Sequence, residues 1–378
     1  MENNIKNKQK LKIAMIGHKY VPSREGGVEI VVEQLSKRLV ELGNEVTLFN
    51  RKRKEYKEIS EYGGCKVKTV YTVNKKSLDA VVYSYFATIK AKKAAKRGEF
   101  DVLHFHAEGP CLFLNRLPKR KRRNYKVVVT IHGLDWQRGK WGGFATKVLL
   151  KGERRAVKYA DEIIVLSENN KKYFKEKYGR DVTYIPNGIT APVFHEPEII
   201  NDKWGLGKNS YVLFLARIVP EKGVHYLIDA WKQVKNTIGT DKKLVIAGGS
   251  SHSDIYYKQI EDACSGEDSI IMTGFVEGQA LQELFTNAYL YVLPSDIEGM
   301  PISLLEAISY GNTCLVSDIP ENTENLPRDG YTFPKGNIAE LAKKLVELIS
   351  EGKGGRREAV IPFTWEEVAD KTLEVYLR

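Results

Sequence analysis

The sequence predicts an α/β protein of two Rossmann-like β/α/β domains, each built on a doubly wound parallel sheet, which face each other across a cleft. The chain has 378 residues, which is longer than most single domains. Short continuous apolar runs alternate with longer segments of helical periodicity, as in parallel sheets that helices cover on both faces. This alternation stops once, in a stretch that contains Pro192 and Pro197, and then restarts, which indicates two successive domains.

The first domain is expected over residues 1–190. A helix over 28–42 has apolar residues at helical spacing and ends at Gly43. A second helix, over 77–97, has a polar face made almost wholly of lysine and arginine. The apolar runs that we predict as buried strands of this domain are 12–17, 45–50, 102–107, 126–133 and 162–167.

The second domain is expected over residues 191–361, and a final amphipathic helix follows over 364–378. In doubly wound sheets, ligands bind beyond the carboxyl ends of the strands, so functional residues are expected directly after each apolar run. The predicted strands of this domain are 211–218, 243–249, 269–276, 288–295 and 313–319.

Charge is distributed unevenly along the chain. Residues 1–195 carry a net charge of +21 and the remainder −10, within a total of +11. A basic domain joined to an acidic one indicates that a single domain meets an anionic surface or substrate. The four cysteines are far apart, which is typical of reduced thiols in a cytosolic protein and predicts no zinc site. Neither a signal peptide nor a membrane-spanning helix is expected.

Two glycines, Gly26 and Gly27, lie where the loop after the first strand enters the first helix. Glycine there lets backbone N–H groups approach a phosphate, and a helix N-terminus favours negative charge. The spacing is not that of a dinucleotide fingerprint, G-x-G-x-x-G, and a glycine pair before a helix is often a tight turn. Anion binding and a plain turn both stay open for this loop.

The loop after the first strand of the second domain contains Arg217 and Lys222. Two cations at the carboxyl end of a strand, in an otherwise acidic domain, indicate an anionic ligand rather than solvated loop charges. The chain contains no D-x-D triplet and no H-E-x-x-H helix, so we expect no metal ion at a bound diphosphate. The two cations are expected to neutralise it instead.

The segment PSDIEGMPISLLEA, residues 294–307, is the most informative pattern. Glu298 precedes a helix whose first turn contains Pro301, and Glu306 lies about a turn and a half inside it. One carboxylate is then placed to contact a sugar ring and the other to accept hydrogen bonds from ribose hydroxyls, while backbone N–H groups near Met300 meet phosphate. The alternative is a capping carboxylate and an unrelated surface carboxylate, which the apolar neighbours of Glu306 disfavour.

Two histidines, His106 and His132, lie at the ends of separate predicted strands, and Asp135 and Trp136 follow the second. A lone histidine at a strand end is usually structural, but two that open toward the same edge indicate a catalytic edge. A basic run at 119–123 adds a second cationic patch to the helix at 77–97. Each basic residue near an anionic bilayer contributes about 1 kcal/mol, so membrane docking and a plain solvated loop are both open.

Taken together, these segments resemble the family 4 glycosyltransferases of GT-B fold, the glycosyl transferases group 1. The resemblance covers nearly the whole chain, and the two-glutamate segment EGMPISLLEA is its most specific part. The resemblance implies transfer of a sugar from a nucleoside diphosphate with retention of anomeric configuration, in which the leaving phosphate takes the acceptor's proton. The other matching segments are GGVE, HFHAEGP, IHGLDW, YIPNG, LARIVPEKG and the GF after SIIMT.

Carried over to this chain, the resemblance implies a role for each matching residue. His106 would lie beside the anomeric carbon and Glu298 at the transferred sugar, as the catalytic pair, and Glu306 would hold the ribose. The last helix, 362–378, would return to the first domain. His132, Asp135 and Trp136 would line the acceptor side. The implied donor-binding residues are Gly26, Gly27, Arg217, Lys222, Phe275, Val276, Gly299, Met300, Pro301 and Glu306.

Two other functions share parts of this pattern. A sugar-nucleotide 2-epimerase or hydrolase of the same fold would use the same phosphate cations, but it would need further carboxylates at the sugar. A non-enzymatic protein that binds an anionic polymer would use the basic half, which lacks interleaved aromatic residues. We therefore expect a cytoplasmic, membrane-peripheral glycosyltransferase of bacterial surface polysaccharide or glycolipid synthesis. Its expected partners are a nucleoside-diphosphate sugar, a saccharide or lipid-linked acceptor and an anionic membrane surface, without nucleic acid, metal or cofactor.

Overall fold

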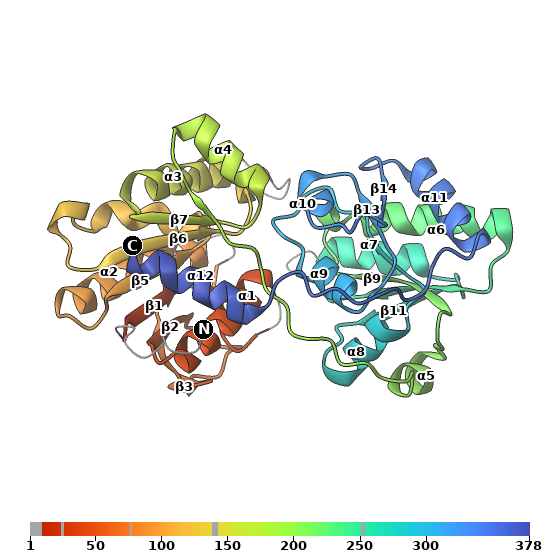
Figure 1. Ribbon diagram of the computed structural model, residues 1–378, viewed down its shortest axis with the longest axis horizontal. Helices are drawn as coiled ribbons and strands as arrows, with labels where there is room; N and C mark the ends of the chain where they lie inside the picture. Colours follow the sequence, from red (N-terminus) through yellow and green to blue (C-terminus); the bar gives the residue numbers. More distant parts are fainter. Residues whose placement is uncertain (1–9, 24–25, 76–77, 138–142, 251–253) are drawn as a thin grey trace. The chain divides into compact units, whose positions relative to one another are not determined.

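The structure is a computed structural model (Figure 1) that describes residues 10–23, 26–75, 78–137, 143–250 and 254–378. It divides into two compact units: unit 1 extends to Gly188 and also contains Trp365–Arg378, and unit 2 comprises Ile189–Thr364. The sequence placed this boundary between residues 190 and 191. The last helix, α12 (Trp365–Leu377), belongs to unit 1, so the predicted return of that helix is confirmed. The cleft predicted between the domains stays a prediction.

Unit 1 contains an eight-stranded sheet in the order β3-β4-β2-β1-β5-β6-β7-β8. Every neighbouring pair is parallel except the hairpin of β3 and β4. The chain winds outward from β1 to β4, returns to the other side of β1 at β5, and winds outward again to β8, which is the predicted doubly wound topology. The strands are β1 (Lys12–Ile16), β2 (Glu45–Arg51), β3 (Glu61–Tyr62), β4 (Cys65–Val70), β5 (Val102–His106), β6 (Lys126–Ile131), β7 (Glu162–Val165) and β8 (Thr183–Tyr184).

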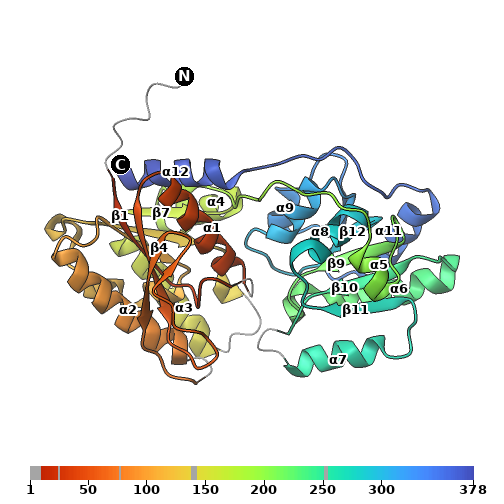
Figure 2. The same cartoon turned by 90° about the horizontal axis from the view of Figure 1, so that it is seen from below.

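Helices cover both faces of this sheet (Figure 2). On one face, α2, α3, α4 and the 3₁₀ segment η1 share a hydrophobic core with residues such as Phe105 of β5. On the other face, α1 packs against α12, and Arg38 pairs with Glu366 at 3.0 Å. The helices are α1 (Gly27–Glu41), α2 (Leu78–Lys96), α3 (Gly143–Tyr159) and α4 (Glu168–Tyr178), with 3₁₀ segments η1 (Gly109–Arg116), η2 (Arg120–Arg122) and η3 (Asp135–Gln137). Ser77, the first residue of the predicted basic helix, lies outside the described residues.

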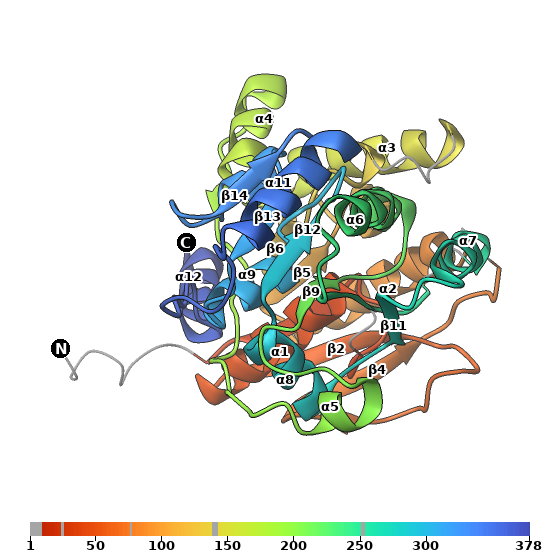
Figure 3. The ribbon, with the colours of Figure 1, turned by 90° about the vertical axis from the view of Figure 1, so that its right-hand side faces the viewer.

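Unit 2 contains a six-stranded sheet, parallel throughout, in the order β11-β10-β9-β12-β13-β14. Two hydrophobic cores lie on its two faces, one beneath α6, α7 and α11 and the other beneath α5, α8 and α9 (Figure 3). The strands are β9 (Tyr211–Leu215), β10 (Lys243–Ala247), β11 (Ile270–Gly274), β12 (Leu290–Leu293), β13 (Cys314–Ser317) and β14 (Tyr331–Phe333). The helices are α5 (Ile199–Trp204), η4 (Pro220–Lys222), α6 (Val224–Ile238), α7 (Asp254–Cys264), α8 (Gly278–Asn287), α9 (Ile302–Ser309), α10 (Pro320–Thr323) and α11 (Ile338–Ser350).

Four strands, β3, β4, β8 and β14, were not predicted. The residues of β4 are alternately buried and exposed over its first four positions, because this strand lies near the edge of the sheet and is covered on one face only. Such a strand has a period of two rather than a continuous apolar run. The three remaining strands, β3, β8 and β14, are only two or three residues long, too short to show a period at all.

The winding direction of each sheet reverses beside its first strand, between β1 and β5 in unit 1 and between β9 and β12 in unit 2. One glycine at each reversal allows two backbone segments to approach closely. A Cβ on Gly17, whose φ is 127°, would lie 2.4 Å from the carbonyl oxygen of His106. A Cβ on Gly223, whose φ is 67°, would lie 2.1 Å from the carbonyl oxygen of Pro294. Ligand sites of doubly wound sheets lie at such reversals, beyond the carboxyl ends of the strands.

Candidate active site

The candidate donor site of unit 2 centres on an ion pair at the reversal between β9 and β12. Lys222 follows β9 and Glu298 follows β12, and the Lys222 Nζ lies 2.6 and 2.7 Å from the two oxygens of the Glu298 carboxylate. The hydroxyl of Ser295 also donates to Oε1 of Glu298, at 2.6 Å. The side chains of Lys222 and Glu298 are only 14% and 6% exposed. A bound diphosphate would therefore share Lys222 with this carboxylate, whereas the sequence had assigned the two residues to separate parts of the donor.

Backbone geometry places this ion pair. The turn η4 holds Lys222 beside β12 because Gly223, in the left-handed region, lets the chain touch Pro294. The backbone N–H of Asp296 donates to the carbonyl of Glu221 at 3.0 Å and ties the two loops together. The glycine of LARIVPEKG is therefore required for the close approach of the two loops.

Helix α9 supplies the second carboxylate of the two-glutamate segment. Glu306 lies in its second turn, as predicted, but Pro301 is the N-cap and the helix begins at Ile302. Burial raises the pKa of Tyr291 well above its ordinary value, and the charges of Glu298 and Glu306 raise it further. The charges of both carboxylates thus raise the pKa of the same buried hydroxyl group. This Tyr291 hydroxyl donates a hydrogen bond to Ser303 Oγ at 2.9 Å. The predicted donor residues Gly299, Met300 and Pro301 are buried.

The remaining predicted donor residues of unit 2 lie along the same carboxyl edge of the sheet. Arg217 follows β9 and is partly buried. Phe275 and Val276 follow β11, the edge strand, and the Phe275 ring is exposed. An exposed aromatic ring at this edge provides a flat apolar surface of the kind on which a nucleotide base stacks.

In unit 1, Gly26 is the N-cap of α1 and Gly27 its first residue. The carboxylate of Glu29, a buried residue to which the sequence assigned no role, accepts a hydrogen bond from the Lys19 backbone N–H at 2.9 Å. A Cβ on Gly26 would lie 2.4 Å from Oε2 of this carboxylate, so a larger residue there would displace the Glu29 side chain. The helix N-terminus predicted to bind an anion thus already holds a carboxylate of the chain itself.

A cluster of histidines lies at the reversal of the unit 1 sheet. His106 Nδ1 and His132 Nε2 are 3.0 Å apart, and His106 Nε2 is buried without a hydrogen-bond partner among the described residues. His104, whose ring centroid is 4.2 Å from that of His106, points to the face covered by α12, where its Nδ1 lies 2.7 Å from the Tyr376 hydroxyl. The sequence indicated two of these histidines together. It missed His104 in β5 and also His18, the residue that follows Gly17 after β1.

Burial determines the charge of these rings. It lowers the pKa of His18 to about 4 and that of His104 to about 3. The pKa of His106 is lowered well below its ordinary value, by burial first and then by the charges of the neighbouring histidines. The three imidazoles are therefore neutral near pH 7, and His106 can act there as a hydrogen-bonding group rather than as a cation.

The residues that follow His106 make a strained and buried corner. Ala107 has a φ of 72°. Residues other than glycine rarely adopt this backbone conformation, and it is frequent at functional sites. Glu108 is fully buried, and its Oε1 accepts a hydrogen bond from the backbone N–H of Asp135 at 3.1 Å. Burial, followed by the charge of Asp135, raises the pKa of Glu108 well above its ordinary value. Glu108, which the sequence did not single out, connects the His106 corner to the predicted acceptor-side loop.

Trp136, predicted on the acceptor side, is held by a second buried carboxylate. Its Nε1 donates to Glu153 at 2.9 Å, and Glu153 also accepts from the hydroxyl of Tyr173 at 2.8 Å. Glu153 is fully buried in α3. The indole is thus anchored by its polar edge, while Asp135 and His132 beside it are partly exposed.

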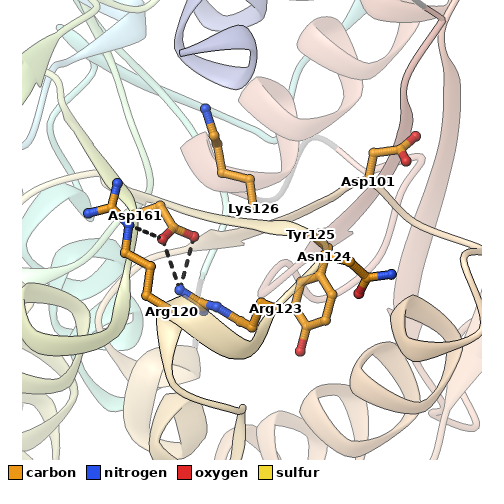
Figure 4. A pocket seen from close by; sticks show the side chains of 7 residues that line it. All are labelled: Asp101, Arg120, Arg123, Asn124, Tyr125, Lys126 and Asp161. Atoms are coloured by element: carbon orange, nitrogen blue, oxygen red, sulfur yellow. Dashed lines mark hydrogen bonds and ion pairs between the residues drawn. The ribbon is translucent and has the colours of Figure 1, made fainter.

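The basic run at 119–123 lies at the opposite edge of the unit 1 sheet. A pocket of about 300 Å³ lies there, at the amino ends of β5, β6 and β7 (Figure 4). Arg123 Nη2 lies 2.9 and 3.0 Å from the two oxygens of Asp161, and Arg120 Nε lies 2.8 Å from the same carboxylate. The Arg123 side chain is almost wholly buried, so the run is not the single exposed cationic patch that was expected. The pocket is lined by Asp101, Arg120, Arg123, Asn124, Tyr125, Lys126 and Asp161.

Over the described residues, no group of three or more His, Cys, Asp or Glu side chains is arranged to hold a metal ion. Transfer without a metal stays a prediction, because it concerns the reaction. No helix in the described part of the chain is both long and apolar enough to cross a membrane.

Two family models match the chain, one in each half. The model described as Glycosyltransferase Family 4 matches residues 25–191, and the model described as Glycosyl transferases group 1 matches residues 197–362. The first match falls almost wholly in unit 1, and the second falls in unit 2.

Individual relatives agree with these matches. The UDP-Gal:alpha-D-GlcNAc-diphosphoundecaprenol alpha-1,3-galactosyltransferase of Escherichia coli is 27% identical over 308 residues, or 76% of this chain and 78% of that one. The structure of sucrose-phosphate synthase from Thermosynechococcus elongatus has a TM-score of 0.75 at 19% identity, covering 96% and 94% of the two chains. The structure of Anabaena HepE in complex with UDP-glucose has a TM-score of 0.72 at 17% identity, covering 97% and 95%. Because the two models of one family match both halves and the whole fold is shared, this chain belongs to the family 4 glycosyltransferases of GT-B fold.

Proposed function

We propose that this glycosyltransferase moves a sugar from a nucleoside diphosphate to a saccharide or lipid-linked acceptor, with retention of anomeric configuration and without a metal ion. The Lys222–Glu298 ion pair is the observation that supports this most directly. It places a cation and a carboxylate side by side at one edge of unit 2, as the adjoining phosphate and sugar of one donor require. Arg217 lies on the same edge and adds a second cation for the diphosphate.

The other donor contacts are assigned along the same edge. Glu306 accepts hydrogen bonds from the ribose hydroxyls, and Phe275 and Val276 contact the base. Backbone N–H groups near Gly299, Met300 and Pro301 in unit 2, and near Gly26 and Gly27 in unit 1, meet the diphosphate. The Glu29 carboxylate in α1 already accepts a hydrogen bond from the Lys19 backbone N–H. We therefore assign any phosphate contact at the unit 1 loop to N–H groups that do not donate to Glu29.

In the proposed reaction, the bond between the anomeric carbon and the diphosphate breaks, and the acceptor oxygen bonds to that carbon on the same face. The acceptor's proton passes to the departing phosphate oxygen. Arg217 and Lys222 stabilise the negative charge that collects on the diphosphate as it leaves. His106 contributes a neutral hydrogen-bonding group, Glu298 contacts the transferred sugar, and His132, Asp135 and Trp136 line the acceptor side.

The biological setting that we propose depends on the lipid-linked acceptor. The Escherichia coli relative is named for UDP-galactose as donor and a diphosphoundecaprenol-linked acceptor. A role in bacterial surface polysaccharide or glycolipid synthesis, at the cytoplasmic side of the membrane, agrees with such an acceptor and with the basic first half of the chain. The donor base is identified by thermal shift with UDP-, GDP-, ADP- and dTDP-sugars, since a ligand of the native state raises the melting temperature.

Calorimetric titration of the matching nucleoside diphosphate, with and without EDTA, tests donor binding without a metal. Arg217→Ala should weaken binding about 10- to 150-fold, the range for a charge-assisted hydrogen bond. Lys208→Ala, an exposed lysine of the same unit that pairs with Glu196, is the matched control and should bind as the wild type does. An affinity that collapses in EDTA refutes the metal-free proposal, and wild-type affinity of the Arg217 variant removes that residue from the site. Proton NMR of the product's anomeric signal tests retention.

A further inference from the structure

Helix α2 presents two different outer surfaces along its length. Its inner side is buried in the unit 1 core through Tyr83 and a series of alanines. The outward side of its first half is apolar: Leu78 is 50% exposed, Tyr85 37% and Phe86 38%, and Val82 and Ile89 are partly exposed. The outward side of its second half is cationic, with Lys90, Lys92, Lys93 and Lys96. The sequence predicted the cationic half but not the apolar one.

Aromatic residues of two neighbouring segments extend the apolar half. The ring of Tyr71, which follows β4 and is 53% exposed, packs edge-on against Phe86 with centroids 5.5 Å apart. Tyr85 packs in the same way against Phe113 of η1, at 5.3 Å. We call Tyr71, Leu78, Tyr85, Phe86 and Phe113 the aromatic face. Contiguous exposed apolar surface of this kind on a soluble unit usually marks an interaction site.

The aromatic face lies at the functional edge of unit 1. Helix α2 follows the carboxyl end of β4, and η1 follows His106 at the carboxyl end of β5. The first turn of α2 is held at this edge by Asp79, whose carboxylate lies 3.0 Å from Arg51 Nη1. Figure 2 shows α2 along the outside of unit 1, on the face opposite α1 and α12. The aromatic half therefore begins at the edge where His106 lies, and the lysine half points away from it.

The four lysines keep their charge unbalanced. Lys90 and Lys92 donate to backbone carbonyls, those of Thr69 and Arg116, at 3.3 and 2.6 Å. Glu99, the carboxylate that follows α2, is bound to Arg97 and Lys68 instead. Among the described residues, no carboxylate pairs with any of the four. A cationic strip thus continues the aromatic face along one helix.

We propose that the aromatic face and the four lysines of α2 dock unit 1 on an anionic lipid bilayer, with the rings in the interfacial layer and the lysines against the headgroups. This rests on the proposed function, because it specifies how the enzyme meets a lipid-linked acceptor. Exposed aromatic and aliphatic residues beside lysines are typical of helices that lie in a membrane interface. A second copy of the chain would bring the same cations against each other in a symmetric contact. A single-stranded nucleic acid would leave Leu78, Val82 and Ile89 without a stacking partner.

Sedimentation with vesicles tests the docking surface. Wild-type protein should bind vesicles rich in phosphatidylglycerol at low salt and bind neutral phosphatidylcholine vesicles far more weakly. Replacing the four lysines by glutamine should reduce partitioning about 600-fold, since each basic residue near an anionic surface contributes about a fivefold factor. Tyr85→Ser with Phe86→Ser should remove the part of the binding that persists at about 1 M salt, where charges are screened beyond about 3 Å. Lys171→Gln with Lys172→Gln, exposed lysines of α4, is the matched control and should bind as the wild type does.

Insertion of the rings is measured separately, by quenching with brominated lipids. A tryptophan at position 86, Phe86→Trp, should be quenched on anionic vesicles more than the wild-type background. Ile255→Trp, at an exposed apolar position of α7 in unit 2, is the control and should not be quenched. Equal quenching of the two variants overturns the assignment to α2.

The outcomes separate this proposal from the proposed function. Nucleoside-diphosphate affinity, measured on every variant, should not change, because none of the substituted residues is a proposed donor contact. Wild-type protein that ignores anionic vesicles at low salt overturns the docking proposal while nucleotide binding still reports on the transferase. Binding that is lost on neutralising 119–123 but not the α2 lysines likewise overturns it.

Discussion

The two units have the same topology at their sites but opposite electrostatics. At the reversal of the unit 1 sheet, the groups around His106 are buried imidazoles whose pKa values burial lowers, together with Glu108, whose pKa burial raises. At the reversal of the unit 2 sheet, Lys222 and Glu298 are also largely buried, yet they form an ion pair. Burial disfavours any charge that lacks a partner, so the presence of an opposite charge decides which form persists.

Under the proposed function, this difference assigns the main cations for the diphosphate to unit 2. A diphosphate is anionic and needs fixed cations, and Lys222 of unit 2 is held in place by the Glu298 carboxylate. The hydroxyl groups of a sugar and an acceptor are neutral, and they are recognised by neutral donors and acceptors such as the imidazoles of unit 1. The comparison therefore predicts that substitutions at the unit 2 site alter stability and nucleotide binding, while substitutions at the unit 1 site alter transfer.

The largest expected effect comes from breaking the unit 2 ion pair. Lys222→Met should destabilise unit 2 by about 3–5 kcal/mol, because it leaves the Glu298 carboxylate buried without a counter-charge. The double variant Lys222→Met with Glu298→Gln should regain most of that loss. Urea unfolding of the four proteins of this double-mutant cycle measures both effects. Additive losses would show that the pair is not coupled.

The second-largest expected effect is the loss of sugar transfer when His106 is replaced. His106→Ala should lower the turnover number about 10²- to 10³-fold, the cost of removing one positioned hydrogen-bonding group at a reacting centre. Nucleoside-diphosphate affinity should stay at the wild-type value, because the two cations proposed for the diphosphate, Arg217 and Lys222, are unchanged. His106→Asn, which keeps a polar group in the buried site, controls for folding. Undiminished transfer in the alanine variant would remove His106 from the site.

The neutral histidines predict how acid affects unit 1. The pKa of His104 is about 3 in the folded chain and about 6.5 when unfolded, so below pH 6.5 only the unfolded chain takes up this proton. Stability should fall as the pH falls through this range, by about 2 kcal/mol for this one group at pH 5. The raised pKa of Glu108 acts in the opposite direction, so the quantity to measure is the difference between wild type and His104→Gln.

Urea unfolding at pH 7.5 and pH 5, with hydrogen exchange to resolve the two units, measures this difference. In the His104→Gln variant, the loss of unit 1 stability between the two pH values should be smaller than in the wild type. Unit 2 should be unaffected by the substitution. An identical pH dependence in both proteins would mean that His104 carries its proton in the folded state as well.

The smallest expected effect distinguishes the two glutamates of the EGMPISLLEA segment. Glu306→Gln should weaken binding of the bare nucleoside diphosphate about tenfold, as the loss of a charged hydrogen-bond acceptor for the ribose predicts. Glu298→Gln should leave the affinity for the bare nucleotide within about threefold and lower turnover, if its ligand is the sugar. Titration of the bare nucleotide and of the sugar nucleotide against each variant separates the two roles. Equal effects on the bare nucleotide would refute the division.

Much of the fold was predictable because its strands are buried on both faces. Ten apolar runs predicted ten of the strands, whereas β4 was missed because it is covered on one face only. The candidate site was predictable to the extent that its residues lie at or shortly after the carboxyl ends of strands, as His106, Arg217 and Glu298 do. His18 also lies just after β1, but it is not part of a segment that the sequence analysis recognised. Glu108 lies within the recognised segment HFHAEGP, in which only His106 was assigned a role.

By itself, the sequence determined the alternation of strands and helices, the division into two doubly wound sheets, the strand-end position of the functional residues and the family. These properties are local, because they depend on the period of apolar residues and on short segments. Only the tertiary structure decided that Lys222 is bound to Glu298, that the histidines around His106 are neutral and that Arg123 is bound to Asp161. It also decided that the outer side of α2 is uncovered, so that rings typical of a core lie at the surface. A charge state and an exposed face depend on contacts between residues far apart in the chain, and the period of a single segment does not contain them.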